Sequence, residues 1–168
     1  RFKDRAKSYD EVARYLEAFV GGKIGNYFIF FPSYEYLRNI EERLSFEDAH
    51  VYSQTKDMTR NDKEEFLNHF RINPEKTHVG LLIIGGSFSE GIDLVDDRLI
   101  GVGIVGVGLP QLSFERDLIS DHYEEKGLKG FDYAYKFPGI NKVMQAMGRL
   151  IRSETDKGAA LLIDDRYQ

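Results

Sequence analysis

Hydrophobic positions follow two different rhythms along this chain. Short runs are apolar at every position, as expected of strands covered on both faces, whereas longer stretches are apolar at every third or fourth position, as expected of helices with one buried face. Such runs predict strands at Tyr27–Phe31 and Val79–Ile84. A stretch of Ile and Val mixed with four glycines predicts a long strand and its exit at Arg98–Leu109, and shorter strands are predicted near His50–Tyr52 and at Ala159–Ile163. The helical rhythm predicts helices at Ser8–Val20, Ser33–Leu44, Asp57–Arg71, Phe114–Glu125 and Gly139–Arg152. This alternation predicts a three-layer α/β fold, with a mostly parallel sheet and helices on both faces.

The length of 168 residues suits one domain. We expect residues 1–168 to form it, with residues 1–22 as a leading helix and residues 111–137 as a helix followed by a loop. The chain begins at Arg1 and not at a methionine, which indicates a segment of a longer protein. Apolar runs stay short of the eighteen or so residues that a membrane span needs, so no membrane partner is expected and a cytoplasmic location is predicted.

Charge and cysteine content exclude several classes of function. The 23 Lys and Arg against 28 Asp and Glu give a net charge of −5, so a globally basic coat for nucleic acid is absent and any polyanion site must be local. With no cysteine, the segment cannot hold a disulfide, a catalytic thiolate or a Cys-ligated metal. The four histidines lack ligand spacing, and we predict no metal site in this segment.

The sequence supports neither of two common nucleotide-binding motifs. Gly101–Gly106 matches the glycine spacing of a dinucleotide-binding turn, but Ile and Val continue through it and Pro110 prevents immediate entry into a helix. A strand with small residues is the better interpretation. The alternative function, a dinucleotide-dependent oxidoreductase, is supported by this match alone. No phosphate-binding loop of the Gly-x-x-x-x-Gly-Lys-Ser/Thr type occurs in the sequence.

The helix predicted at Gly139–Arg152 carries cations without acids. Between Tyr133 and Ser153 there is no Asp or Glu. At about 100° per residue, one side of this helix holds Lys142, Gln145, Arg149 and Arg152, and the other, expected to pack on the sheet, holds Ile140, Val143, Met147, Leu150 and Ile151. A solvated face is one explanation. The other is an anion site, because two guanidiniums on successive turns suit the oxygens of a polyphosphate.

Two turns at strand ends offer further candidates. The segment Gly85–Asp93 follows a buried strand, at the end of the sheet where ligands bind in such folds. Ser87 and Ser89 could donate hydrogen bonds to a phosphate, and Asp93 could accept one from a ribose hydroxyl. A tight turn with an incidental acid explains the same residues. Ser33, after another strand, could cap its helix beside backbone N–H groups that bind phosphate, and capping alone is the simpler explanation.

These segments, in this order, resemble the second RecA-like domain of superfamily 2 helicases of the DinG/XPD branch. Val143–Arg152 looks like motif VI of that branch, Gly86–Asp93 like motif V, and Phe30–Tyr34 like motif IV. Asp156–Gly158 and Leu162–Arg166 look like the usual continuation. The resemblance spans residues 27–166, and residues 111–137 form an insertion or variable segment within it.

The resemblance implies the C-terminal motor domain of an ATP-dependent DNA helicase, with a role in DNA repair. The first RecA-like domain of the same chain would hold ATP and most of the Mg²⁺ site, and an iron–sulfur cluster, where the parent has one, would also lie there. Arg149 and Arg152 would reach the γ-phosphate, with Gln145 orienting one of them or the attacking water.

By the same resemblance, Glu90, Gly91 and Asp93 would line the nucleotide. Ser33, Ser87 and Ser89 would contact the backbone of single-stranded DNA, along which the motor would travel from the five-prime to the three-prime end. The segment alone is expected to hydrolyse no ATP. The alternative is a non-catalytic nucleotide-sensing or protein-interaction module of the same fold; Gln145, Arg149 and Arg152 argue against it, because such a module has no need of them.

Overall fold

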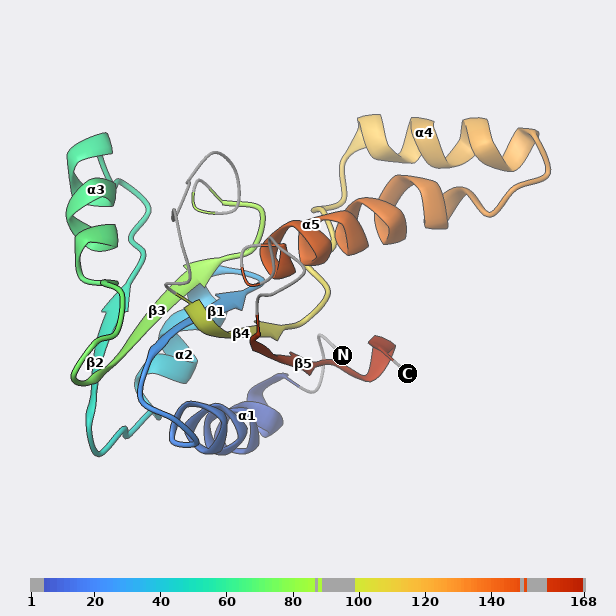
Figure 1. Ribbon diagram of the computed structural model, residues 1–168. Coiled ribbons are helices and arrows are strands. Elements are labelled where there is room, and N and C mark those ends of the chain that lie inside the picture. The colour runs from blue at the N-terminus through green and yellow to red at the C-terminus, as the bar shows by residue number, and fades with distance from the viewer. Residues whose placement is uncertain (1–4, 87, 89–98, 149, 151–156, 168) are drawn as a thin grey trace.

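One parallel sheet forms the centre of the computed structural model, which describes residues 5–86, 88, 99–148, 150 and 157–167. Its strands are β1 (Asn26–Phe31), β2 (Ala49–Ser53), β3 (Thr77–Ile83), β4 (Leu99–Val105) and β5 (Ala159–Ile163). They lie in the order β2-β3-β1-β4-β5, and every neighbouring pair is parallel (Figure 1). The predicted three-layer α/β fold is therefore confirmed.

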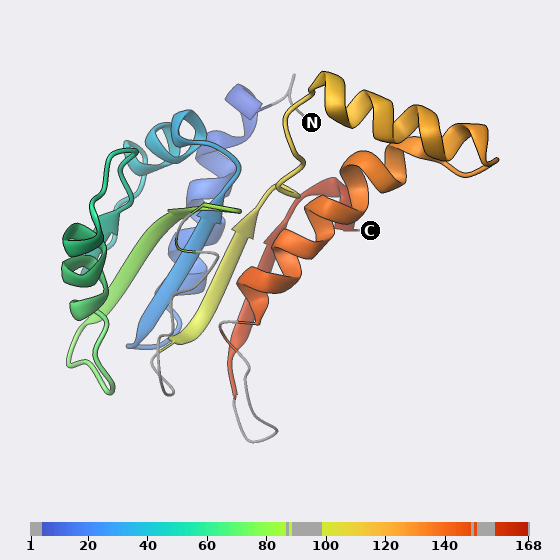
Figure 2. The same ribbon diagram turned by 90° about the horizontal axis from the view of Figure 1, so that it is seen from above.

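Helices cover both faces of this sheet (Figure 2). They are α1 (Arg5–Val20), α2 (Tyr34–Glu41), α3 (Arg60–Asn68), α4 (Phe114–Glu125) and α5 (Phe137–Met147). Apolar side chains of α1 and α2 join one core cluster, and those of α3 and α5 join another on the opposite face. None of the helices in the described ranges is long and apolar enough to cross a membrane.

The central strand β1 shows why the sheet is buried on both sides. All six of its residues are buried. Phe28 and Phe30 point into the cluster under α3 and α5, whereas Tyr27, Ile29 and Phe31 point into the cluster under α1 and α2. A run that is apolar at every position satisfies both cores at once, as its sequence predicted.

The glycines of residues 101–106 have a structural role in β4. Gly101 pairs with Tyr27 in register, and a Cβ at Gly101 would lie 2.4 Å from Cδ1 of the tyrosine ring. The ring occupies the space that a side chain would need. The interpretation of this segment as a strand with small residues is confirmed, and the strand ends at Val105 because Gly106 and Gly108 adopt φ of 79° and 59°.

Several predicted helix boundaries were wrong. The predicted helix Asp57–Arg71 begins only at Arg60, because Thr59 caps it and Asp62 completes a capping box. The predicted helix Ser33–Leu44 ends at Glu41.

The chain after α4 also departs from expectation. The predicted loop up to Phe137 is instead a short turn followed by a π-helical segment, Asp132–Lys136, which leads directly into α5. This segment runs back along α4: Arg116 donates to the Ala134 carbonyl at 2.6 Å, and the Tyr123 and Tyr133 rings stack with centroids 4.0 Å apart. The resulting helical hairpin extends beyond the sheet in both views (Figures 1 and 2).

Candidate functional site

The carboxyl ends of the strands place the candidate residues at one edge of the sheet. Because all pairs are parallel, the ends of β1, β3 and β5 at Phe31, Ile83 and Ile163 lie along the same edge. Ser33, the Gly85–Gly86 turn and Asp164 directly follow these ends. Ligands of open parallel sheets bind at this edge, so it is the candidate site.

Ser33 caps α2. Its backbone is extended, with φ of −161°, and its hydroxyl oxygen accepts a hydrogen bond from the Tyr36 N–H at 3.2 Å. The side chain is half-buried. This cap satisfies one of the N–H groups at the start of the helix and leaves the remaining ones facing the site edge.

The turn after β3 lies under α5. Gly85 has φ of +70°, and a Cβ there would meet the Lys142 side chain, 2.8 Å from its Cδ atom. The lysine therefore lies directly over the turn. Two segments that the sequence singled out separately, the glycine turn and the cationic helix, are in contact.

The predicted helix Gly139–Arg152 is observed as α5, which ends at Met147; Leu150 follows it, and Ile151 lies outside the described residues. Val143 and Leu150 are buried, and Met147 packs partly against the same core. Ile140, which was expected to pack on the sheet, is 37% exposed, because the start of α5 extends past the sheet toward the hairpin. Gln145 is exposed, as the predicted polar face requires.

Gln54 is a central residue of this edge that the sequence analysis missed. It follows β2 and is 5% exposed. Its Oε1 accepts a hydrogen bond from the Ile83 N–H at 2.9 Å, and its Nε2 donates to the Tyr34 hydroxyl at 3.1 Å. One amide thus joins the end of β3 to the first residue of α2. The only sequence signal was a polar residue directly after a strand.

Tyr34 continues this network toward the surface. Its hydroxyl donates to the Thr55 carbonyl at 3.3 Å, and the Lys56 ammonium lies 5.8 Å from its ring centroid. Burial raises the pKa of Tyr34, the hydrogen bond from Gln54 lowers it, and the negative charge of Asp57 raises it, with a net rise. The phenol stays neutral at physiological pH and acts as a hydrogen-bonding link.

The remaining candidates fall outside the described residues: Arg149, Arg152, Glu90, Gly91, Asp93, Ser87 and Ser89. Of the candidates for catalysis and binding, the structure therefore places Ser33 and Gln145. Among the residues that it describes, no group of three or more His, Asp or Glu side chains is arranged to hold a metal ion.

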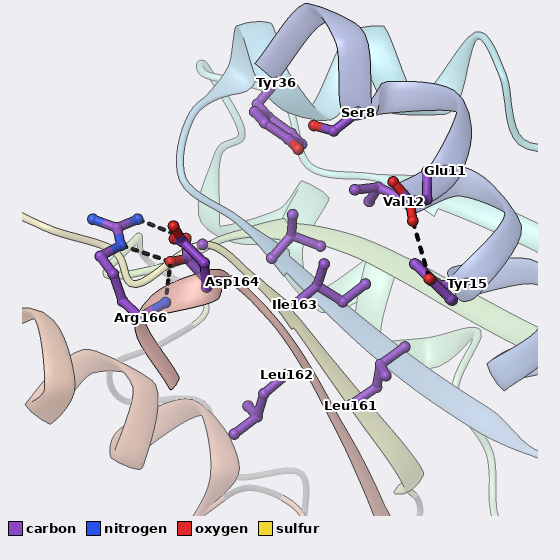
Figure 3. A pocket seen from close by; sticks show the side chains of 13 residues that line it. Ser8, Glu11, Val12, Tyr15, Tyr36, Leu161, Leu162, Ile163, Asp164 and Arg166 are labelled. Atoms are coloured by element: carbon purple, nitrogen blue, oxygen red, sulfur yellow. Dashed lines mark hydrogen bonds and ion pairs between the residues drawn. The ribbon is translucent and has the colours of Figure 1, made fainter. Parts of the chain in front are cut away.

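A cavity of about 650 Å³ lies between α1 and β5 and reaches this edge at Gly106 and Asp164 (Figure 3). On its wall, Arg166 donates to both carboxylate oxygens of Asp164, each at 2.6 Å. Burial acts to raise the pKa of Asp164, but the hydrogen bonds and charge of Arg166 outweigh it, so the pKa is lowered. Neither Ser33 nor Gln145 lines this cavity, and the ion pair is satisfied internally.

Tyr167 holds the neighbouring chain end in place. Its hydroxyl donates to the Gly106 carbonyl at 2.8 Å, and burial raises its pKa to about 12. The segment after β5 is thereby fastened to the turn after β4, beside the candidate edge. We assign both contacts a structural role.

A parallel sheet in this strand order, with helices on both faces and Lys142 of α5 lying over a glycine turn at the carboxyl edge, is a RecA-like α/β fold. The chain belongs to the helicase C-terminal domain family, whose model matches residues 16–168. This family match and the helicase relatives agree with the expected kinship to the DinG/XPD branch, and the solved structures share the fold.

Two relatives and one solved structure illustrate the similarity. The chain is 27% identical to the regulator of telomere elongation helicase 1 homolog of Aedes aegypti, covering 98% of this chain and 18% of that protein. It is 27% identical to an ATP-dependent DNA helicase of Caenorhabditis elegans, covering 83% of this chain and 18% of that one. An XPD helicase structure superposes with a TM-score of 0.72 at 23% identity, covering 95% of this chain and 28% of that one. The chain thus spans about a fifth of the length of these two relatives.

Proposed function

We propose that this chain is the C-terminal motor domain of an ATP-dependent DNA helicase. The observation that carries the proposal is the contact between α5 and the turn after β3, where Lys142 lies over Gly85. It sets the helix that bears Gln145 across the edge where parallel sheets bind ligands. Arg149 and Arg152 follow Gln145 in sequence by four and seven residues.

In this proposal the nucleotide lies between two domains. The first RecA-like domain of the parent chain holds ATP and the Mg²⁺ ion. Arg149 and Arg152 reach across the interface to the γ-phosphate, where one of them stabilises the charge that develops on the transferred phosphoryl group, an effect typically worth about 10³ to 10⁵ in rate. Gln145 orients the arginine or the attacking water, and Glu90, Gly91 and Asp93 line the nucleotide.

Single-stranded DNA is the proposed track. The N–H groups at the start of α2, which Ser33 organises by capping, face the site edge and suit a backbone phosphate. Ser33, Ser87 and Ser89 position the strand without reading its bases. Hydrolysis would change the contacts to the γ-phosphate and so move this domain relative to its partner along the strand.

An iron–sulfur cluster of the parent protein, where there is one, belongs to the upstream half in this proposal. This segment has no cysteine, so it cannot supply the usual thiolate ligands of such a cluster. Its contribution to catalysis would be made by Arg149, Arg152 and Gln145.

The test is the ATPase rate stimulated by single-stranded DNA, measured on this domain joined to its own upstream half. Arg149→Ala and Arg152→Ala are compared with wild type and with Lys126→Ala, an exposed cation of the hairpin turn, as the matched control. We expect a fall of about a hundredfold or more in at least one arginine variant, with DNA binding retained, and an unchanged rate in the control. Wild-type rates in both arginine variants would instead favour the non-catalytic module.

A further inference from the structure

Three of the four histidines lie together at the opposite, amino-terminal edge of the sheet. His50 in β2 and His78 in β3 are partners in the strand register, and their ring centroids are 5.3 Å apart. His69, at the end of α3, stacks on Tyr52 with centroids 4.0 Å apart. The Tyr52 ring is in turn 5.8 Å from that of His78. Strand pairing thus assembles a cluster from residues whose sequence spacing indicated none.

This cluster lines a cavity of about 520 Å³. The loop between α3 and β3 forms one side of it, and the charged and titratable residues of its wall are His50, His69, Arg71, Glu75, Lys76 and His78. Five of these side chains are cationic or become so on protonation, whereas Glu75 is the carboxylate among them. The wall is therefore biased toward an anion, and the bias grows as the imidazoles take up protons.

The electrostatics of His78 follow from its neighbours. Burial lowers its pKa, and the positive charges of His50 and His69 lower it further. Its Nδ1 atom is buried without a hydrogen-bond partner among the described residues. The His78 ring is thus held neutral at pH 7, and the negative charge of a bound anion would favour its protonated form.

The other charged groups around the cluster are few. Glu65 lies one turn before His69 on α3, and Lys63 lies further back along the same helix. The Lys76 ammonium is 3.9 Å from the carboxylate of Asp48, and both side chains are well exposed. Arg71 accepts a hydrogen bond from Asn26 through its carbonyl at 2.7 Å, which anchors the loop to β1. The guanidinium of Arg71 belongs to the cavity wall.

We propose that this cavity binds a phosphate group, and that His78 takes up a proton when it does. Arg71 and Lys76 supply permanent positive charge, and the imidazolium of His78 adds a charge-assisted hydrogen bond to the same oxygens. The site lies across the sheet from the candidate nucleotide edge, so it is a second site, independent of the proposed ATPase chemistry. The phosphate group could belong to a nucleic-acid backbone or to a free phosphate ion.

The histidine rings themselves provide the assay, because the chain has four histidines and the fourth, His122 in α4, lies outside the cavity lining. Imidazole proton resonances of the chain are followed by NMR from about pH 5 to 8 with inorganic phosphate, with sulfate and with chloride of equal ionic strength. Sulfate keeps its charge over this range and so isolates the protons taken up by the protein. We expect phosphate and sulfate to raise the pKa of His78 above its value in chloride and to shift the ring resonances of His50, whereas the resonances of His122 stay unchanged.

Affinity gives an independent readout. For one linked proton, binding of sulfate tightens up to about tenfold per pH unit as the pH falls through the histidine range. Arg71→Ala and His78→Gln should each weaken it about tenfold or more, and His122→Gln should leave it unchanged. Arg71 is exposed, so its variant keeps the test open even if His78→Gln does not fold.

An oligothymidylate measured beside inorganic phosphate separates the two sources of the phosphate group. Tighter binding of the strand, lost in Arg71→Ala, assigns the site to a nucleic-acid backbone, and equal binding assigns it to a free phosphate. The proposal is wrong if all four histidines shift alike, if none shifts, or if Zn²⁺ and not phosphate moves His50 and His78. Each of these readouts is independent of ATP hydrolysis, so the phosphate site is tested separately from the proposed function.

Discussion

Replacing Gln54 with alanine should destabilise the fold by about 1.5–4.5 kcal/mol. The variant removes the Gln54 oxygen that accepts from the Ile83 N–H, and the loss of this acceptor from a half-buried backbone donor costs about 1–3 kcal/mol. It also removes the bond to the Tyr34 hydroxyl, which adds about 0.5–1.5 kcal/mol. The glutamine is 5% exposed, so water cannot readily replace either bond.

Tyr34→Phe is the matched control for this prediction. It removes the hydroxyl but keeps the bond between Gln54 and Ile83, so it should cost only about 0.5–1.5 kcal/mol. The double variant should cost less than the sum of the two single variants, because both remove the same bond between the Gln54 amide and the Tyr34 hydroxyl. Urea unfolding of the chain, followed by far-ultraviolet circular dichroism, measures all three.

Two outcomes would contradict the proposed role of Gln54. If Gln54→Ala costs no more than Tyr34→Phe, then the bond to the Ile83 N–H contributes nothing and the amide is not the link between β3 and α2. If the two variants are strictly additive, the bond between Gln54 and Tyr34 contributes nothing to stability. Either outcome would remove Gln54 from the account of the site.

Three further predictions test other parts of the edge. Ser33→Ala should lower the free energy of unfolding in urea by about 1 kcal/mol. Ser33→Asp should keep the cap but weaken binding of single-stranded DNA, because its negative charge would face a backbone phosphate. Equal DNA binding by the two variants would show that Ser33 does not contact the strand. Gly85→Ala should cost about 1–2 kcal/mol because φ is +70°, and adding Lys142→Ala should relieve the contact but not this strain. The pKa of Asp164 is lowered in the fold, so its ion pair with Arg166 stabilises the fold at pH values above its ordinary pKa near 4. This stability is lost as the pH falls through the lower folded value. In Asp164→Asn, the free energy of unfolding should therefore depend less on pH between about pH 5 and 2.

The strands could be predicted from the sequence because each is a strong local signal. In β1 and β3, runs of apolar residues bounded by glycine or proline leave few alternatives, and only their ends moved by one or two residues. Helix α4 was predicted with its observed bounds, since Ser113 caps its start and Gly127, with φ of +75°, follows its end.

The errors have a common cause in contacts that form between distant segments. The stretch Asp132–Lys136 is aromatic and polar, which alone indicates a loop, yet it becomes helical because Tyr133 stacks on Tyr123 and the Tyr135 hydroxyl donates to Asp117 at 2.7 Å. Gln54 and the histidine cluster were missed for the same reason. Pairing of the strands brings their partners next to them, and the hydrophobic periodicity of the sequence does not predict which residues of separate strands come into contact.

The network at the carboxyl edge determines how this domain can work as half of a motor. Gln54 joins the end of β3 to the start of α2, and Lys142 lies over the turn that follows β3. Since α2, β3 and α5 are tied at this edge, a force on α5 would be passed to the start of α2 with little internal movement. In the proposed helicase, the change between nucleotide states therefore falls between the two domains, while α2, β3 and α5 move together on this side.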